Sequence, residues 1–156
     1  MIRPMTASSP GSPDPEIVSS RTLDVPRERV FRAFAEPELL RRWWGPSGFT
    51  NTFERFDFRA GGSWHFTMYA PDGTAIPMVK RFLEVSAPER IVLLHEQGEH
   101  TFRMSMVFEE AGSGTTLTWR MVFQFPEEAE RVRAFVEPAN EQNFDRLEEV
   151  LREMDR

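Results

Sequence analysis

The residues that could carry acid–base or metal chemistry are few, and they lie far apart along the chain. The sequence has no cysteine, which excludes thiolate zinc sites and cysteine nucleophiles, and its three histidines are His65, His95 and His100. None of these histidines has the i, i+4 spacing that places two ligands on one helical face. His65 and His95 could meet across a sheet, but that arrangement is only a weak indication of a metal site. We therefore expect no metal, no cofactor and no identifiable catalytic residue.

One carboxylate has a setting that allows either a chemical or a structural role. Asp57 lies between Phe56 and Phe58, shortly before Gly61. As a general base, it would lie at the mouth of a pocket. As a structural group, it would pair with Arg59 or cap the glycine turn. The structural role is the favoured interpretation.

Motifs that identify a reaction class are missing from the sequence. There is no nucleophile elbow, phosphate-binding loop or glycine-rich dinucleotide turn. The formal net charge is −6 and Lys80 is the only lysine, so we expect no nucleic-acid partner. No apolar run approaches the roughly 18–20 residues of a membrane span. The proline-rich segment 1–15 lacks a signal-peptide core and predicts a disordered tail before one domain over 16–156, in a cytoplasmic protein.

The spacing of apolar residues predicts an α+β fold. Alternation of period two indicates strands, and apolar residues three or four apart indicate helices. An antiparallel sheet with one apolar face needs a cover, and only the last helix is long enough to supply it. We expect Pro138 to bend or interrupt that helix. The predicted elements are a strand over 16–24, short helices over 27–35 and 39–44, strands over 52–59, 64–69, 78–85, 91–96, 101–109 and 117–123, and a long helix from 127 onward.

The inward positions of these strands are rich in aromatic residues and methionines. Two interpretations stay open, because composition does not separate them. The side chains could form a close-packed core, or they could line a pocket whose methionines repack around varied ligands. The inward set is Trp64, Phe66, Met68, Phe82, Phe102, Met104, Met106, Trp119, Met121 and Phe123.

Two polar residues fall on positions that the alternation places inward. Arg81 shares strand parity with the apolar Val79, Leu83 and Val85, and His95 shares it with Ile91 and Leu93. A buried arginine is costly without an acidic partner or an anionic ligand. A single β-bulge would reverse this parity and turn the two neighbours of Arg81 inward instead.

Two stretches of the sequence carry a resemblance to a known family. The motifs Leu39–Pro46 (LLRRWWGP) and Phe56–Trp64 (FDFRAGGSW) resemble the paired signature of the SRPBCC superfamily. More narrowly, the chain looks like the single-domain bacterial branch related to the C-terminal domain of the heat-shock protein 90 ATPase activator. Val25–Phe31 is similar to the first helix of that family, and the resemblance extends over Ile17–Met154.

The resemblance implies a helix-grip, START-like fold. In such a fold a curved antiparallel sheet of about six or seven strands wraps around a long C-terminal helix, with two short helices after the first strand and a deep cavity inside. Family members bind lipids, polyketides, plant hormones or other hydrophobic compounds, and some are aromatases or cyclases. No set of catalytic residues is general to this branch.

These observations predict a protein that holds a small hydrophobic or aromatic ligand between the sheet and the last helix, with a stress-related role as part of that expectation. The alternatives are an enzyme of the cyclase or aromatase kind that uses the same cavity, and a chaperone-associated interaction module. A homodimer through a sheet edge or through Trp43 and Trp44 is a further expectation. The candidate ligand-binding residues are Trp64, Phe66, Met68, Phe82, Arg81, His95, Met104, Met106, Trp119, Met121, Phe144 and Leu147.

Overall fold

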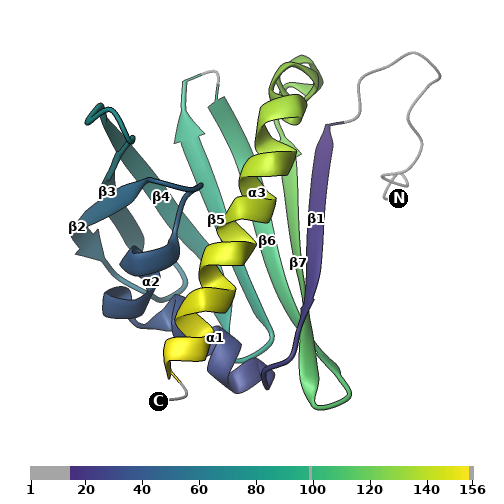
Figure 1. The fold of residues 1–156 in the computed structure, drawn as a ribbon. Helices are drawn as coiled ribbons and strands as arrows, with labels where there is room; N and C mark the ends of the chain where they lie inside the picture. The colour runs from purple at the N-terminus through teal and green to yellow at the C-terminus, as the bar shows by residue number, and fades with distance from the viewer. Residues whose placement is uncertain (1–14, 99, 155–156) are drawn as a thin grey trace.

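The computed structural model is built on one antiparallel sheet with a long helix across its concave face (Figure 1). The structure describes residues 15–98 and 100–154, so the tail predicted over 1–15 lies outside the described residues except for Pro15. In chain order the elements are β1 (Glu16–Leu23), α1 (Arg27–Ala35), α2 (Pro37–Trp43), β2 (Thr50–Phe56), β3 (Ser63–Tyr69), β4 (Ala75–Ser86), β5 (Arg90–Gln97), β6 (His100–Ala111), β7 (Gly114–Phe123) and α3 (Pro126–Met154). The predicted order of elements and the α+β class are confirmed.

The sheet has seven strands in the order β1-β7-β6-β5-β4-β3-β2. Every neighbouring pair is antiparallel, and β2 to β7 follow one another as a meander. β1 pairs with the last strand, so α1 and α2 carry the chain from one edge of the sheet to the other. The helix-grip arrangement expected from the family resemblance is therefore present.

Alternation along the strands separates a buried face from an outer face. On β3, Trp64, Phe66 and Met68 are buried and the residues between them are less so. β4 departs from this regularity, because its pairing with β5 shifts between Phe82 and Glu84. Such a bulge inserts one unpaired residue and reverses the inward parity beyond it.

The long helix α3 has two unequal halves. Its C-terminal half buries Phe144, Leu147 and Leu151, whereas most residues of the segment 130–139 are exposed or half-buried. α3 continues on both sides of Pro138, so the predicted interruption does not occur. Pro138 is exposed, where the carbonyl freed by its missing N–H can reach water. Within the described part of the chain, no helix is both long and apolar enough to cross a membrane.

The loop after α2 is fastened to α3 by polar side chains. Asn143 donates to the carbonyl of Trp43 (2.7 Å) and accepts from the backbone N–H of Gly45 (3.2 Å). The guanidinium of Arg146 lies 2.9–3.3 Å from the carbonyl oxygens of four residues, namely Arg42, Trp44, Gly45 and Pro46. Gly45 has φ +103°, and a Cβ there would lie 2.7 Å from the Met68 methyl carbon. The signature Leu39–Pro46 therefore works as the docking point of the last helix.

Candidate functional site

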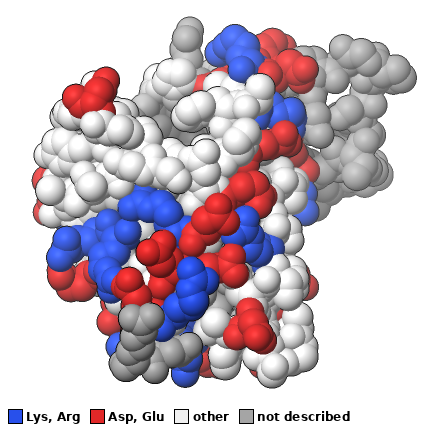
Figure 2. Space-filling view, in the orientation of Figure 1, with Lys and Arg blue, Asp and Glu red and all other residues white. Residues whose placement is uncertain are grey.

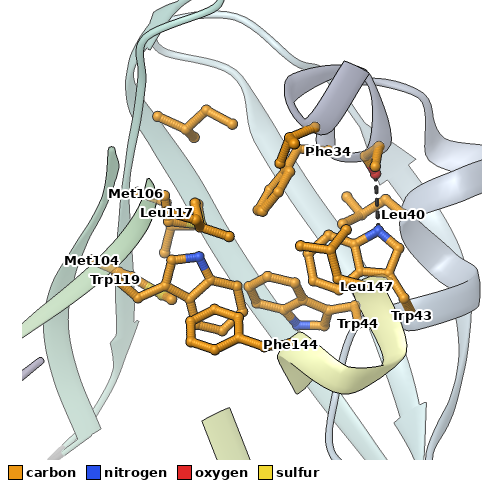
Figure 3. Packing of buried hydrophobic residues seen from close by; sticks show 14 of the residues in the cluster. Phe34, Leu40, Trp43, Trp44, Met104, Met106, Leu117, Trp119, Phe144 and Leu147 are labelled. Carbon is orange, nitrogen blue, oxygen red and sulfur yellow. Dashed lines mark hydrogen bonds between the residues drawn. The ribbon is translucent and has the colours of Figure 1, made fainter. Parts of the chain in front are cut away.

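The ten apolar candidates belong to one buried cluster, and Figure 3 shows part of it, with Trp119 and Phe144 beside Trp43 and Trp44. The Trp44 ring bridges the cluster, with ring centroids 5.1 Å from Trp64 and 5.5 Å from Trp119. Trp64 stacks on Phe66 at 4.2 Å, and Trp119 meets Phe144 at 4.7 Å. These rings pack directly against one another, so the interior around Trp44, Trp64 and Trp119 is a close-packed core. The eight members closed to water are Trp64, Phe66, Phe82, Met104, Met106, Trp119, Phe144 and Leu147, none more than 3% exposed.

Trp43 and Trp44 anchor the short helices onto this core. Trp43 is fully buried and donates its indole N–H to the Ala33 carbonyl at 3.0 Å. Trp44 is 7% exposed. Both rings are therefore packed into the core, and a homodimer through this region or through a sheet edge stays a prediction.

Burial of the concave face lessens toward the N-terminal half of α3. Met68 and Met121 keep a small accessible area, and Met78 and Phe102 are half-buried while packing against the core. Charged side chains gather along α3, whereas the neighbouring surface on the β2–β4 side is mostly uncharged (Figure 2). We call the inward group Met68, Met78, Phe102 and Met121 the open end of the concave face.

Two inward polar residues meet at this open end. Strand register places Lys80 opposite Trp64 on β3 and His95 on β5, and it places His95 opposite Phe102 on β6. Lys80 Nζ lies 3.2 Å from His95 Nδ1 and 5.2 Å from the centroid of the Phe102 ring. Lys80 is 4% exposed and His95 is 5% exposed. The inward orientation of His95 agrees with its predicted parity.

The electrostatics of the pair follow from its burial. Desolvation lowers the pKa of Lys80 to about 7. Desolvation, followed by the nearby charges of Lys80 and His100, lowers the pKa of His95 to about 3. His95 is therefore neutral at pH 7. The protonated amine of Lys80 can only donate, so in that state the Nδ1 lone pair of His95 accepts from Nζ and the histidine proton lies on Nε2.

Arg81 does not belong to the site, and this corrects the sequence prediction. Arg81 is exposed on the face of β4 opposite to Lys80 and Phe82. The inference of an inward Arg81 took its parity from Val79, Leu83 and Val85. Val79 faces outward and is 47% exposed, Leu83 lies at the shift between Phe82 and Glu84, and Val85 follows that shift. The inward cation of this strand is its neighbour Lys80.

The other titratable candidates have structural roles. Asp57 binds Arg59 through both carboxylate oxygens, at 3.0 and 2.8 Å, as the structural interpretation expected. A Cβ on Gly62 would lie 2.0 Å from the Asp57 carbonyl oxygen, which explains the glycine in this turn. His100 pairs with the buried Glu128.

The histidines do not assemble into a metal site. His65 pairs with Val79, an outward residue that is 47% exposed, so it does not meet His95 across the sheet. Among residues 15–98 and 100–154, no group of three or more His, Asp or Glu side chains could hold a metal ion.

The cluster also holds two hydrogen-bond donors without an acceptor. The indole Nε1 atoms of Trp64 and Trp119 are buried and have no hydrogen-bond partner in the described structure. Such donors are costly unless another acceptor reaches them. They are two places where an acceptor atom of a ligand would be favourable.

Sequence reasoning did not select three residues at or beside the open end as candidates: Met78, Asn140 and Lys80, the last of which it considered only as the inward neighbour of Arg81 in the alternative register. Asn140 on α3 is buried and donates to Ser19 Oγ at 3.1 Å. Met78 lies on β4, and the alternation before the bulge would have placed Met78, Lys80 and Phe82 on one face. A usable signal was the single lysine of the chain within an apolar strand.

Comparison with known proteins agrees with this architecture. The model of one family, described as "Activator of Hsp90 ATPase homolog 1-like protein", matches residues 24–152. A search of curated proteins finds no match.

Several solved structures share the fold. A protein from Nitrosomonas europaea has a TM-score of 0.81 at 24% identity, covering 89% of this chain and 95% of that one. A protein from Arthrobacter aurescens has a TM-score of 0.82 at 22% identity, covering 89% and 87%. An AHSA1-like protein from Aeromonas hydrophila has a TM-score of 0.70 at 19% identity, covering 90% and 94%. At these identities the likeness concerns the fold.

Proposed function

Because the chain belongs to the family of activator of Hsp90 ATPase homolog 1-like proteins, we propose that it binds a small hydrophobic or aromatic ligand on the concave face beneath α3. Folds of this type commonly bind hydrophobic ligands. The open end carries the proposal, because Met78 and Phe102 are only half-buried although they pack against the core. Methionines are suited to such a site, since their flexible side chains repack around different shapes.

The packed cluster bounds the proposed site on the side of the C-terminal half of α3. The ligand lies on the open-end side of this cluster, against Met68 and Met121, whose side chains change rotamer to accommodate it. Removal of apolar ligand surface from water drives binding by about 25 cal/mol per Å2.

Met78 and Val79 offer a matched pair of variants to test this location. Met78 faces the core on β4, and Val79 faces outward on the same strand. We expect Met78→Glu to abolish binding of phenylnaphthylamine, a neutral apolar dye, because a carboxylate would replace apolar lining. Val79→Glu should bind like the wild type. Dye fluorescence measures binding, and thermal melts followed by circular dichroism establish that both variants are folded.

Two results would overturn the proposal. One is a folded Met78→Glu variant that binds the dye like the wild type. The other is a wild-type protein that neither binds the dye nor carries a co-purified small molecule in native mass spectrometry.

The remaining expectations from the sequence stay predictions with their own tests. A cyclase or aromatase activity would lose turnover rate in His95→Ala. A chaperone-associated module would be retained by the cognate chaperone and would change its ATPase rate. Sedimentation velocity tests a homodimer, and cell fractionation tests a cytoplasmic location.

A further inference from the structure

Lys80 is chemically unique in this chain. It is the single lysine among 19 lysine and arginine residues, and it is 4% exposed. Lysine is almost never fully buried unless it is paired. The burial of this residue on the concave face therefore calls for a specific explanation.

Two other cations of the molecule, Arg21 and Arg146, are compensated by the protein itself. Arg21 lies 2.6–2.8 Å from carboxylate oxygens of Glu141, Asp145 and Glu148. Arg146 binds four backbone carbonyls. Both guanidinium groups thus have partners carrying negative charge or a carbonyl dipole.

Lys80 has no such compensation. The partners of its Nζ atom are the neutral His95 ring, at 3.2 Å, and the face of Phe102, at 5.2 Å. Among the residues that the structure describes, no carboxylate lies within 4.0 Å of this nitrogen. A buried cation without an anion is costly, and a bound anion would relieve that cost.

The position of Lys80 connects it to the open end of the concave face. Lys80 lies two residues after the half-buried Met78 on β4, so both side chains point to the same face of the sheet. The Lys80 amine lies over the half-buried ring of Phe102. A molecule whose apolar body covers these side chains would bring its polar end to the Lys80 amine.

We infer that the site selects apolar molecules bearing one acidic group, a carboxylate or sulfonate, and that Lys80 Nζ receives this group while His95 holds the amine in place. This inference rests on the proposed function and adds the chemical class of the ligand. The low pKa of Lys80 agrees with it, because an arriving anion would stabilise the protonated amine.

Two dyes that share one ring system separate the acidic group from the apolar body. Anilinonaphthalene sulfonate carries a sulfonate that phenylnaphthylamine lacks. Lys80→Met removes the amine and keeps an unbranched apolar side chain. Arg81→Met is the matched control, since it removes the adjacent cation from the outer face of the same strand.

We expect Lys80→Met to weaken the binding of anilinonaphthalene sulfonate by about tenfold or more at pH 7, because a buried charge pair is lost. Its affinity for phenylnaphthylamine should be equal to or higher than that of the wild type. Arg81→Met should bind both dyes like the wild type. A melting temperature of Lys80→Met at or above the wild-type value shows that the variant is folded.

The possible failures are distinguishable. If the wild type binds phenylnaphthylamine and Lys80→Met binds the sulfonate like the wild type, the inference is overturned and the proposed function stands. Equal weakening in Arg81→Met would place the sulfonate on the outer surface and overturn the inference as well. If the wild type binds neither dye, the proposed function and the inference fall together.

Discussion

Lys80 and His95 show how burial sets the protonation of two neighbouring side chains. The imidazole accepts from the amine at Nδ1, so a proton at that atom would remove the bond and add a second buried charge. The charge of Lys80 accordingly adds to desolvation in lowering the pKa of His95. The concave face therefore holds one buried amine, that of Lys80, whose pKa is close to neutral pH.

This titration predicts how stability depends on pH. Desolvation lowers the pKa of Lys80 from 10.5 in its ordinary state to about 7 in the folded protein. Between these values the unfolded chain binds more protons than the folded one, so the free energy of unfolding rises with pH. The unfavourable contribution of Lys80 to stability is therefore present in full below pH 7, decreases as the pH rises from 7 to 10.5, and is absent above pH 10.5. We expect an increase approaching about 1 kcal/mol per pH unit within that window.

Urea unfolding at successive pH values measures this slope. Lys80→Met should lose the Lys80 contribution and be more stable than the wild type at pH 7, by about 1–4 kcal/mol, as for other buried charges replaced by apolar residues. Arg81→Met, which removes an exposed charge from the same strand, should keep the wild-type slope. Identical slopes in the wild type and Lys80→Met would contradict the assignment.

The same residues show why sequence reasoning placed His95 correctly and Arg81 incorrectly. β5 pairs regularly with β6 over its whole length, so alternation from Leu93 leads directly to His95. β4 carries a bulge, and alternation counted from Val85 back to Arg81 crosses it. A bulge depends on pairing with a neighbouring strand, and the local sequence pattern does not contain that information.

At the scale of elements, the same turns of α3 supply both polar contacts and apolar packing. Arg146 and Asn143 bind the loop that follows α2, while Phe144 and Leu147 enter the aromatic cluster. Trp43 at the end of α2 and Trp44 directly after it anchor the short helices onto this cluster. The polar contacts from α3 could not be predicted, because they join residues about 100 positions apart in the sequence.

Arg146 should therefore contribute more to stability than an exposed arginine of the same helix. Arg146→Ala removes contacts to four backbone carbonyls, and hydrogen bonds from charged groups contribute about 1.5–3 kcal/mol. We expect Arg146→Ala to lower the free energy of unfolding by at least about 2 kcal/mol. Arg131→Ala, at an exposed position of α3, should change it by less than about 0.5 kcal/mol. Equal effects in chemical denaturation would show that the docking contacts carry little energy.

At the scale of the whole molecule, the sequence predicted the sheet and its covering helix, but it did not predict how the side chains between them pack. Alternation and the length of the last helix were sufficient for a sheet covered by that helix. Whether the rings of Trp64 and Trp119 would meet or leave a void depends on the rotamers of many side chains at once. Those rings meet through Trp44, so the interior near the C-terminal half of α3 is core, and the proposed ligand site lies toward the other half.

This division predicts a gradient of local stability along α3. Phe144, Leu147, Val150 and Leu151 are buried, whereas the segment 130–139 buries little and contains a proline that removes one helical hydrogen bond. Segments with few buried apolar contacts open at lower free energy than the core. Native-state hydrogen exchange should therefore show amides of residues 132–139 exchanging at least about tenfold faster than those of residues 144–151.

Addition of anilinonaphthalene sulfonate should slow exchange in residues 132–139 and leave residues 144–151 unchanged, because a ligand at the open end contacts only the less packed half of the molecule. Uniform protection along α3 would contradict this gradient, and slowing confined to residues 144–151 would move the ligand into the aromatic cluster.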